Sequence, residues 1–164
     1  MVLALSMTAA VVDLRTRRIP NLLVLPAIVA GLALALVQAP RLLLLRSSAV
    51  IVVLIAGMFL FSAGIVGGGD GKLVAAIAAL KGFVFTAETI LYALLAGGLV
   101  SLIVLIRRRK LRAGLMRAVS AVAGGQQGEA FEGTHIPFAP IIALGVIVAV
   151  ATSAAGWHIT ELFA

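Results

Sequence analysis

The chain contains no cysteine, and aromatic and acidic residues are scarce in it. Without cysteine it can hold no disulfide, thiolate metal site or iron–sulfur cluster, and it has no cysteine nucleophile. Aromatic residues make up 5% of the chain, and none interleaves with the basic run at residues 107–110. Redox chemistry and a nucleic-acid partner are therefore not expected.

Apolar residues dominate what remains. The chain of 164 residues is 63% hydrophobic and 12% charged, and its mean hydropathy is +1.23. A soluble fold of this composition would have too little polar surface to cover itself. A bilayer core needs roughly 20 apolar residues for each crossing helix. We therefore predict one membrane-embedded domain over residues 1–164, with no separate soluble domain.

Apolar runs separated by charged residues or by glycine and proline indicate the membrane spans. The fold class that we predict is all-α, a compact bundle of about six transmembrane helices. The first predicted span is short, and the fourth contains Lys81. Residues 107–136 are predicted to be a cytoplasmic connector. The six spans are expected near residues 1–13, 20–39, 48–66, 70–86, 88–106 and 137–156.

The basic residues are distributed unevenly between the two sides of this predicted bundle. Ten of them follow the first, third and fifth spans, whereas Arg41, Arg46 and Lys81 fall on the other side. Loops rich in lysine and arginine stay in the cytoplasm. We therefore expect the N-terminus outside and the ends of the first, third and fifth spans in the cytoplasm. The ten are Arg15, Arg17, Arg18, Lys72, Arg107, Arg108, Arg109, Lys110, Arg112 and Arg117.

The chain has only two aspartates, Asp13 and Asp70, and each lies at a predicted cytoplasmic end of an apolar run. Ionisable residues near a bilayer are costly and are candidates for function. Two carboxyls that converge from separate helices share a proton, because like charges at close range do not both ionise. Such a pair can hydrolyse an amide: one carboxylate activates water, and the protonated partner hydrogen-bonds the carbonyl oxygen.

Each aspartate also has a purely structural interpretation. Asp13 and Arg17 stand four residues apart and could form a surface ion pair on a helix. Asp70 follows three glycines and could be the N-cap of the next helix. Two other functions also fit an acidic pair, a small transporter coupled to protons or cations and a non-catalytic membrane scaffold.

The residues beside the aspartates complete the candidate site. Pro20 suits the first turn of a helix because its φ is fixed and it lacks an N–H. Glycines close to Asp70 would let a substrate backbone approach the carboxyl, and we expect Lys72 to contact headgroups or position the substrate. No metal or cofactor is expected. The site-shaping candidates are Pro20, Asn21, Gly67, Gly69, Gly71 and Lys72.

Three motifs in order resemble the type IV prepilin peptidase family. They are D-x-R-x-x-x-I-P-N from residue 13, G-x-G-D-x-K-L from residue 67, and I-P-F-A-P-I-I-A-L-G at 136–145. The resemblance implies an aspartic endopeptidase of the cytoplasmic (inner) membrane that cuts the leader from a prepilin or pseudopilin helix at the cytoplasmic face. It also implies that Asp13 and Asp70 are the catalytic pair.

The chain departs from the family pattern in one respect. Many members carry a cytoplasmic segment with paired C-x-x-C motifs that methylates the new amino terminus, and this chain has no cysteine. We therefore predict a peptidase without methyltransferase activity. The short form resembles the Tad/Flp-pilus branch, although archaeal preflagellin peptidases are also short.

Two further predictions concern residues away from the motifs. Gly57, Gly97 and Gly98 are expected to allow close packing between helices. His135 lies just before the last predicted span, where an interfacial position is expected.

Overall fold

The computed structural model describes residues 1–16, 19–63, 66–107 and 138–156. These residues form an all-helical bundle, as the sequence predicts. The predicted connector and His135 lie outside them, except for Arg107. The helices are α1 (Val2–Thr16), α2 (Asn21–Gln38), α3 (Pro40–Ser62), α4 (Gly68–Lys81), α5 (Phe83–Arg107) and α7 (Ala139–Ala154).

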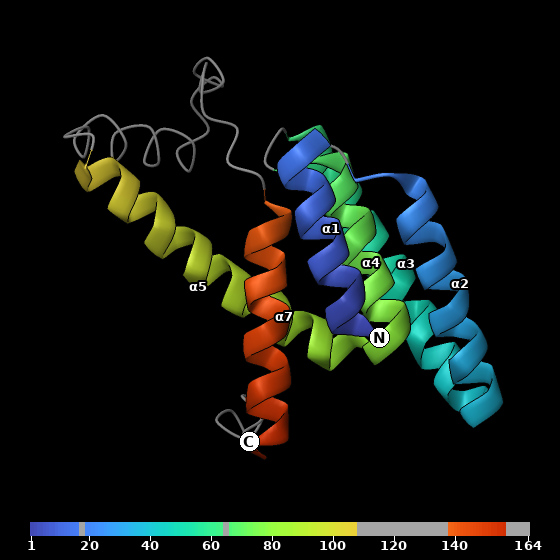
Figure 1. Ribbon diagram of the computed structural model, residues 1–164. Helices are drawn as coiled ribbons and strands as arrows, with labels where there is room; N and C mark the ends of the chain where they lie inside the picture. Colours follow the sequence, from blue (N-terminus) through green and yellow to red (C-terminus); the bar gives the residue numbers. More distant parts are fainter. Residues whose placement is uncertain (17–18, 64–65, 108–137, 157–164) are drawn as a thin grey trace.

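The helices run alternately up and down the bundle (Figure 1). Consequently α1, α3 and α5 finish at the end where α2, α4 and α7 begin. We call this the site end, because both aspartates belong to it. In Figure 1 the helix α5 crosses α7, and the last turns of α5 lean away from the other helices.

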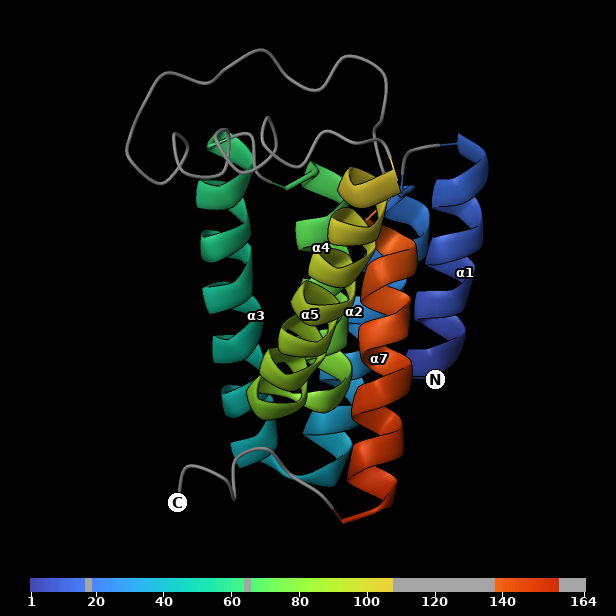
Figure 2. The ribbon, with the colours of Figure 1, turned by 90° about the vertical axis from the view of Figure 1, so that its left-hand side faces the viewer.

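The short helix α4 occupies the middle of the bundle and contacts all five of the other helices (Figure 2). Its residues 75–79 are fully buried, and most of them are alanines. Small side chains let neighbouring backbones approach closely. A Cβ atom added at Gly31 of α2 would lie 2.7 Å from the carbonyl carbon of Ala79. The alanine-rich helix therefore sets the spacing of the bundle.

Among the described residues, three helices are long and apolar enough to cross a membrane, namely α2, α3 and the Phe83–Ile103 part of α5. The helix α7 is apolar but shorter. At 14 residues, α4 is about 21 Å long. Because α4 is surrounded by other helices, its burial does not require the length of a lipid-exposed span. The chain is thus a helical membrane bundle in which α4 is largely enclosed by protein.

Several helix boundaries differ from the predicted spans. The helix α3 begins at Pro40 and not near residue 48, and α1 continues to Thr16. Hydropathy reports the lipid-facing stretch, whereas backbone hydrogen bonding continues through charged residues at the ends. The fourth span ends at Lys81 and not at residue 86, because Gly82 adopts φ 88°. This left-handed conformation suits glycine and allows α5 to begin at once.

Two of the three packing glycines are confirmed. A Cβ atom at Gly57 would lie 3.4 Å from the Cα of Gly71, and one at Gly97 would lie 3.3 Å from Cγ2 of Ile141. The prediction for Gly98 is wrong, because a Cβ atom there would meet no described residue within 4 Å. Adjacent helical residues point in directions about 100° apart, so only one of the pair faces α7.

Candidate active site

Asp13 lies one turn before the end of α1 and is buried, with 7% of its surface exposed. Its Oδ2 accepts a hydrogen bond of 3.4 Å from the backbone N–H of Ala139, the first residue of α7. The first amides of a helix have no acceptor within the helix. Asp13 therefore provides an acceptor for one of the free amides of α7 and joins α1 to α7 at the site end.

Asp70 lies in the first turn of α4 and is partly buried. Its interpretation as the N-cap of this helix is wrong, because Gly67 occupies that position. The amide of Asp70 donates to the carbonyl oxygen of Gly67 at 3.0 Å. A Cβ atom at Gly67 would lie 2.8 Å from Oδ2 of Asp70, so the carboxyl folds back over this glycine. A side chain at residue 67 would displace it.

The surroundings of Asp70 change its acidity. It lies outside the three helices that are long and apolar enough to cross a membrane. Burial, and secondly the negative charge of Asp13, raise the pKa of Asp70 from 3.8 to about 6, although a backbone hydrogen bond with Gly67 opposes the shift. The influence of Asp13 shows that α1 and α4 bring the two carboxyls close enough to interact. Such a pair is suited to acid–base chemistry near neutral pH.

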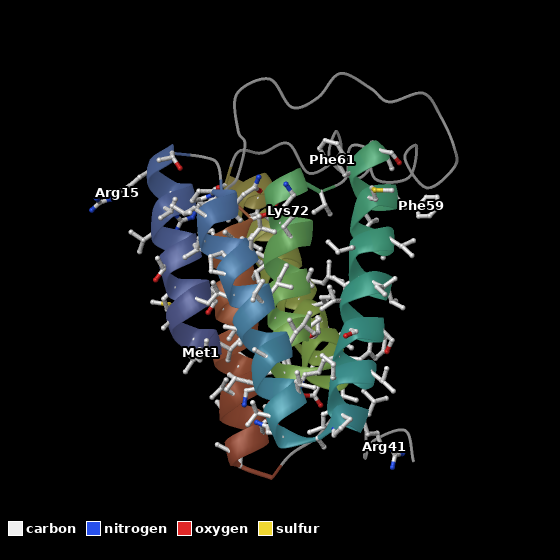
Figure 3. The ribbon with its side chains drawn as sticks, turned by 90° about the vertical axis from the view of Figure 1, so that its right-hand side faces the viewer. Met1, Arg15, Arg41, Phe59, Phe61 and Lys72 are labelled. Carbon is white, nitrogen blue, oxygen red and sulfur yellow. The ribbon has the colours of Figure 1, made fainter. Side chains whose placement is uncertain are left out.

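A second contact joins α2 to α4 near the carboxyls. Lys72 Nζ donates to Oδ1 of Asn21 at 3.0 Å, and both side chains are exposed. Pro20 is the N-cap of α2, one position before the helical turn predicted for it. In Figure 3 Lys72 lies at the site end beside α2, whereas Arg15 projects away from the bundle. Lys72 and Asn21 therefore form a polar rim beside the carboxyls.

The other two glycines of the motif contact neighbouring parts of the chain. A Cβ atom at Gly69 would lie 3.2 Å from Cβ of Ile19, and one at Gly71 would lie 3.5 Å from the Cα of Gly57. Gly69 thus makes room for the segment before α2, and Gly71 for α3. That these glycines also admit a substrate backbone stays a prediction.

The contact that the sequence did not indicate is the amide of Ala139 on Asp13. Residues 136–145 belong to a recognised motif, but no role followed from their types. Prolines near the start of a helical run are a signal for a helix N-terminus, and Pro140 is the second residue of α7. That signal indicates that free backbone amides lie near residue 139. It does not indicate which side chain accepts a hydrogen bond from them.

The described residues test the other predictions for the site only in part. Arg17, the alternative ion-pair partner of Asp13, lies outside the described residues. Within the described ranges, no group of three or more histidine, cysteine, aspartate or glutamate side chains could hold a metal ion. The expected lack of a metal or cofactor stays a prediction.

Comparison with known proteins gives one match. The sequence profile of the type IV leader peptidase family matches residues 1–102. The match includes both aspartates and the polar rim, and α7 lies beyond it. No curated protein and no solved structure matches the chain.

Proposed function

This chain belongs to the type IV leader peptidase family, and on that premise we propose that it is a membrane aspartic endopeptidase that removes the leader peptide from type IV prepilins or related pseudopilins. The observation that carries the proposal is that its only two aspartates lie at the same end of the bundle, where the charge of Asp13 helps to raise the pKa of Asp70. Asp13 of α1 and Asp70 of α4 stand 57 positions apart in the chain and interact at one end of the bundle. The proposed catalytic residues are these two carboxyls.

The proposed hydrolysis requires that the two carboxyls together hold one proton. The ionised carboxyl removes a proton from water as the water oxygen attacks the scissile carbonyl carbon. The protonated carboxyl stabilises the carbonyl oxygen, and the C–N bond then breaks with proton transfer to the leaving amine. No metal is needed for these steps.

The proposed substrate is an apolar helix that reaches the site from the lipid. An intact helix keeps its carbonyl groups in internal hydrogen bonds, so the junction between leader and helix must unwind before water can attack it. Lys72 and Asn21 are exposed beside the carboxyls and are the proposed contacts for the polar leader.

The proposed location is the cytoplasmic membrane, with the N-terminus outside and the carboxyls at the cytoplasmic face. The helices α1 and α5 finish at the site end, and most of the ten basic residues counted above come directly after them in the sequence. At the opposite end, Arg41 lies far from Arg15 and Lys72 (Figure 3). This distribution supports the cytoplasmic orientation.

Cysteine labelling tests the orientation without background, because the natural chain has no cysteine. A cysteine at Thr16, the last residue of α1, is expected to react with a membrane-impermeant reagent only from the cytoplasm. One at Ala39, between α2 and α3, is expected to react only from outside. Labelling of Thr16→Cys from outside in intact cells would overturn the proposed face.

The reaction itself is tested with the purified protein in liposomes. It is given a prepilin as the substrate and S-adenosylmethionine as the methyl donor. We expect cleavage at the junction between leader and helix, and a mature product whose mass corresponds to an unmodified amino terminus. The reason for the second expectation is that the chain lacks the cysteine motifs of the methylating members. Absence of cleavage with a panel of prepilins, or methylation that requires this chain alone, would contradict the proposal.

A further inference from the structure

One stripe of α5 packs against α7 in the middle of the helix and is exposed toward the site end. Its residues are spaced alternately four and three apart, so they share one side of the helix. At Thr89 and Ala93 the stripe packs against Gly145 of α7, and these two residues are 0% and 2% exposed. Further along the same stripe, Val100 and Ile103 are 38% and 44% exposed. In the described part of the chain, the stripe therefore loses its partner helix before α5 ends.

Contacts around α4 show which side of this helix lies toward α5. Gly71 faces α3, and Lys72 faces α2. Leu73 packs in the apolar cluster that α1 and α7 share. Successive residues of a helix turn by about 100°, so the remaining direction, between α7 and α3, belongs to Asp70 and Val74. Figure 2 shows α5 passing in front of α4 in this direction, between α3 and α7.

The side of α4 that lies toward α5 is also partly open at the site end. Asp70 and Val74 are only partly buried, whereas residues 75–79 are fully buried. At this end the last turns of α5 lean away from the other helices (Figure 1). Val74 of α4 and the exposed stripe residues Val100 and Ile103 of α5 thus flank the approach to Asp70. We call these three apolar residues the lateral face.

The two sides of Asp70 differ in polarity. On the α5 side the lateral face is apolar, and α5 has no charged residue between Glu88 and Arg107. On the α2 side lies the polar rim of Lys72 and Asn21. A chain that joins a polar leader to an apolar helix is divided in the same way, and the bond to be cut lies at its boundary.

We propose that the apolar helix of the prepilin docks on the lateral face, between α5 and α4, with the scissile junction at Asp70 and the leader directed toward α2. This inference rests on the function proposed above and deepens it, because it assigns a binding surface to the substrate helix. Val74, Val100 and Ile103 are the proposed helix-binding residues.

The stripe itself indicates that its occupant is a helix. Residues alternately three and four apart form the seam by which one helix packs against another, and α7 already packs on the middle of the same stripe. In lipid, such packing takes the place of the hydrophobic effect as the attraction between helices. The exposed part of α5 from Gly98 to Arg107 is about 15 Å long, roughly half of the hydrocarbon core. The substrate helix is therefore held in the half of the membrane nearest the site end.

Photocrosslinking from two adjacent residues tests the lateral face. A photoreactive phenylalanine derivative replaces Ile103 or Leu102 in the full chain, which is reconstituted in liposomes with a prepilin. The Asp70→Asn background keeps the prepilin uncut. The two replaced side chains are isomers at nearly the same depth, but Leu102 is turned away from the stripe. We expect at least about fivefold more crosslinking to the prepilin from Ile103 than from Leu102.

Mass spectrometry of the crosslinked peptides tests the direction of the substrate. Crosslinks from Ile103 should lie in the apolar helix of the prepilin, and crosslinks from the same derivative at Asn21 should lie in the leader. Equal crosslinking from Ile103 and Leu102 would overturn the inference. So would crosslinks from Ile103 that reach only lipid, a second copy of the chain or another part of the same chain.

A matched pair of tryptophan variants tests the same surface by kinetics. Ile103→Trp adds bulk to the lateral face, and Leu102→Trp adds similar bulk on the side of α5 turned away from it. We expect Ile103→Trp to raise the KM for the prepilin about tenfold, because an overfilled contact must separate, while kcat stays within about twofold. Leu102→Trp should leave both constants near the wild-type values. Equal KM values in two variants that unfold at the wild-type temperature would contradict the docking.

The two experiments separate the docking from the proposed function. A wild-type chain that cuts no prepilin, although Ile103 crosslinks to the prepilin helix, would refute the peptidase and leave the docking surface standing. A chain that cuts prepilins but crosslinks to them equally from Ile103 and Leu102 would refute only the docking.

Discussion

Asp13→Asn and Asp70→Asn are each expected to abolish prepilin cleavage, with a loss of at least about 10³-fold in rate. Asparagine keeps nearly the volume of aspartate but removes a carboxyl that the proposed chemistry requires. Because the two groups act on one proton, the double variant should be scarcely slower than either single variant. The measurement is cleavage of a prepilin in liposomes by the wild type, both single variants and the double variant.

Thermal unfolding separates loss of chemistry from loss of fold. Removing one of two repelling carboxyls costs the bundle little, so the variants should insert and unfold near the wild-type temperature. Glu88→Gln is the matched control, because it makes the same chemical change at a buried carboxyl in the second turn of α5, near the opposite end. It is expected to retain cleavage when folded. Near-normal cleavage by a folded Asp13→Asn or Asp70→Asn protein would refute the aspartic mechanism.

Among variants that add a single methyl group, Gly145→Ala is expected to lower the free energy of unfolding the most. Gly145 is buried on α7, and a Cβ atom there would overlap the carbonyl oxygen of Thr89 on α5. The same Cβ atom would lie 3.0 Å from the backbone nitrogen and the Cβ of Ala93. Because these groups are backbone or next to it, the helices must move apart. We expect a cost of about 1 to 3 kcal/mol, which outweighs the gain of up to about 1 kcal/mol from replacing a helical glycine. Thermal or denaturant unfolding in detergent measures the difference.

Gly98→Ala provides the control from the facing helix. In the part of the chain that the structure describes, a Cβ atom at Gly98 would meet nothing within 4 Å, so only the helical preference of alanine remains. This variant is expected to be neutral or slightly stabilised. If Gly145→Ala were as stable as Gly98→Ala, the close crossing of α5 and α7 would be wrong. Because α7 also supplies the amide for Asp13, a loosened crossing should reduce cleavage as well.

The membrane class and the two aspartates were accessible from the sequence because both are local properties. Long apolar runs predict helices in a bilayer whatever their neighbours are. Two aspartates among so few acidic residues, each beside a recognisable motif, single themselves out before any fold is known. The family match over residues 1–102 includes both motifs that contain them.

Helix boundaries were harder to predict from the sequence, because hydropathy reports exposure to lipid and not backbone hydrogen bonding. Arg41 and Arg46 stand inside α3, although they lie before the predicted span. Similarly, α4 is short because Gly82 ends it, and its enclosure by five helices makes a full-length apolar surface unnecessary. A window of sequence contains no information about such neighbours.

The sequence by itself determined that the chain is a helical membrane protein, and it singled out Asp13 and Asp70 as the two aspartates of the chain. Only the tertiary structure decided which glycines lie at helix crossings, since Gly31 and Gly145 do and Gly98 does not. It also decided that Asp13 meets the amide of Ala139, 126 positions away. The physical reason is that residue type and spacing govern backbone conformation and burial locally, whereas the partner of a carboxyl depends on how separate helices pack.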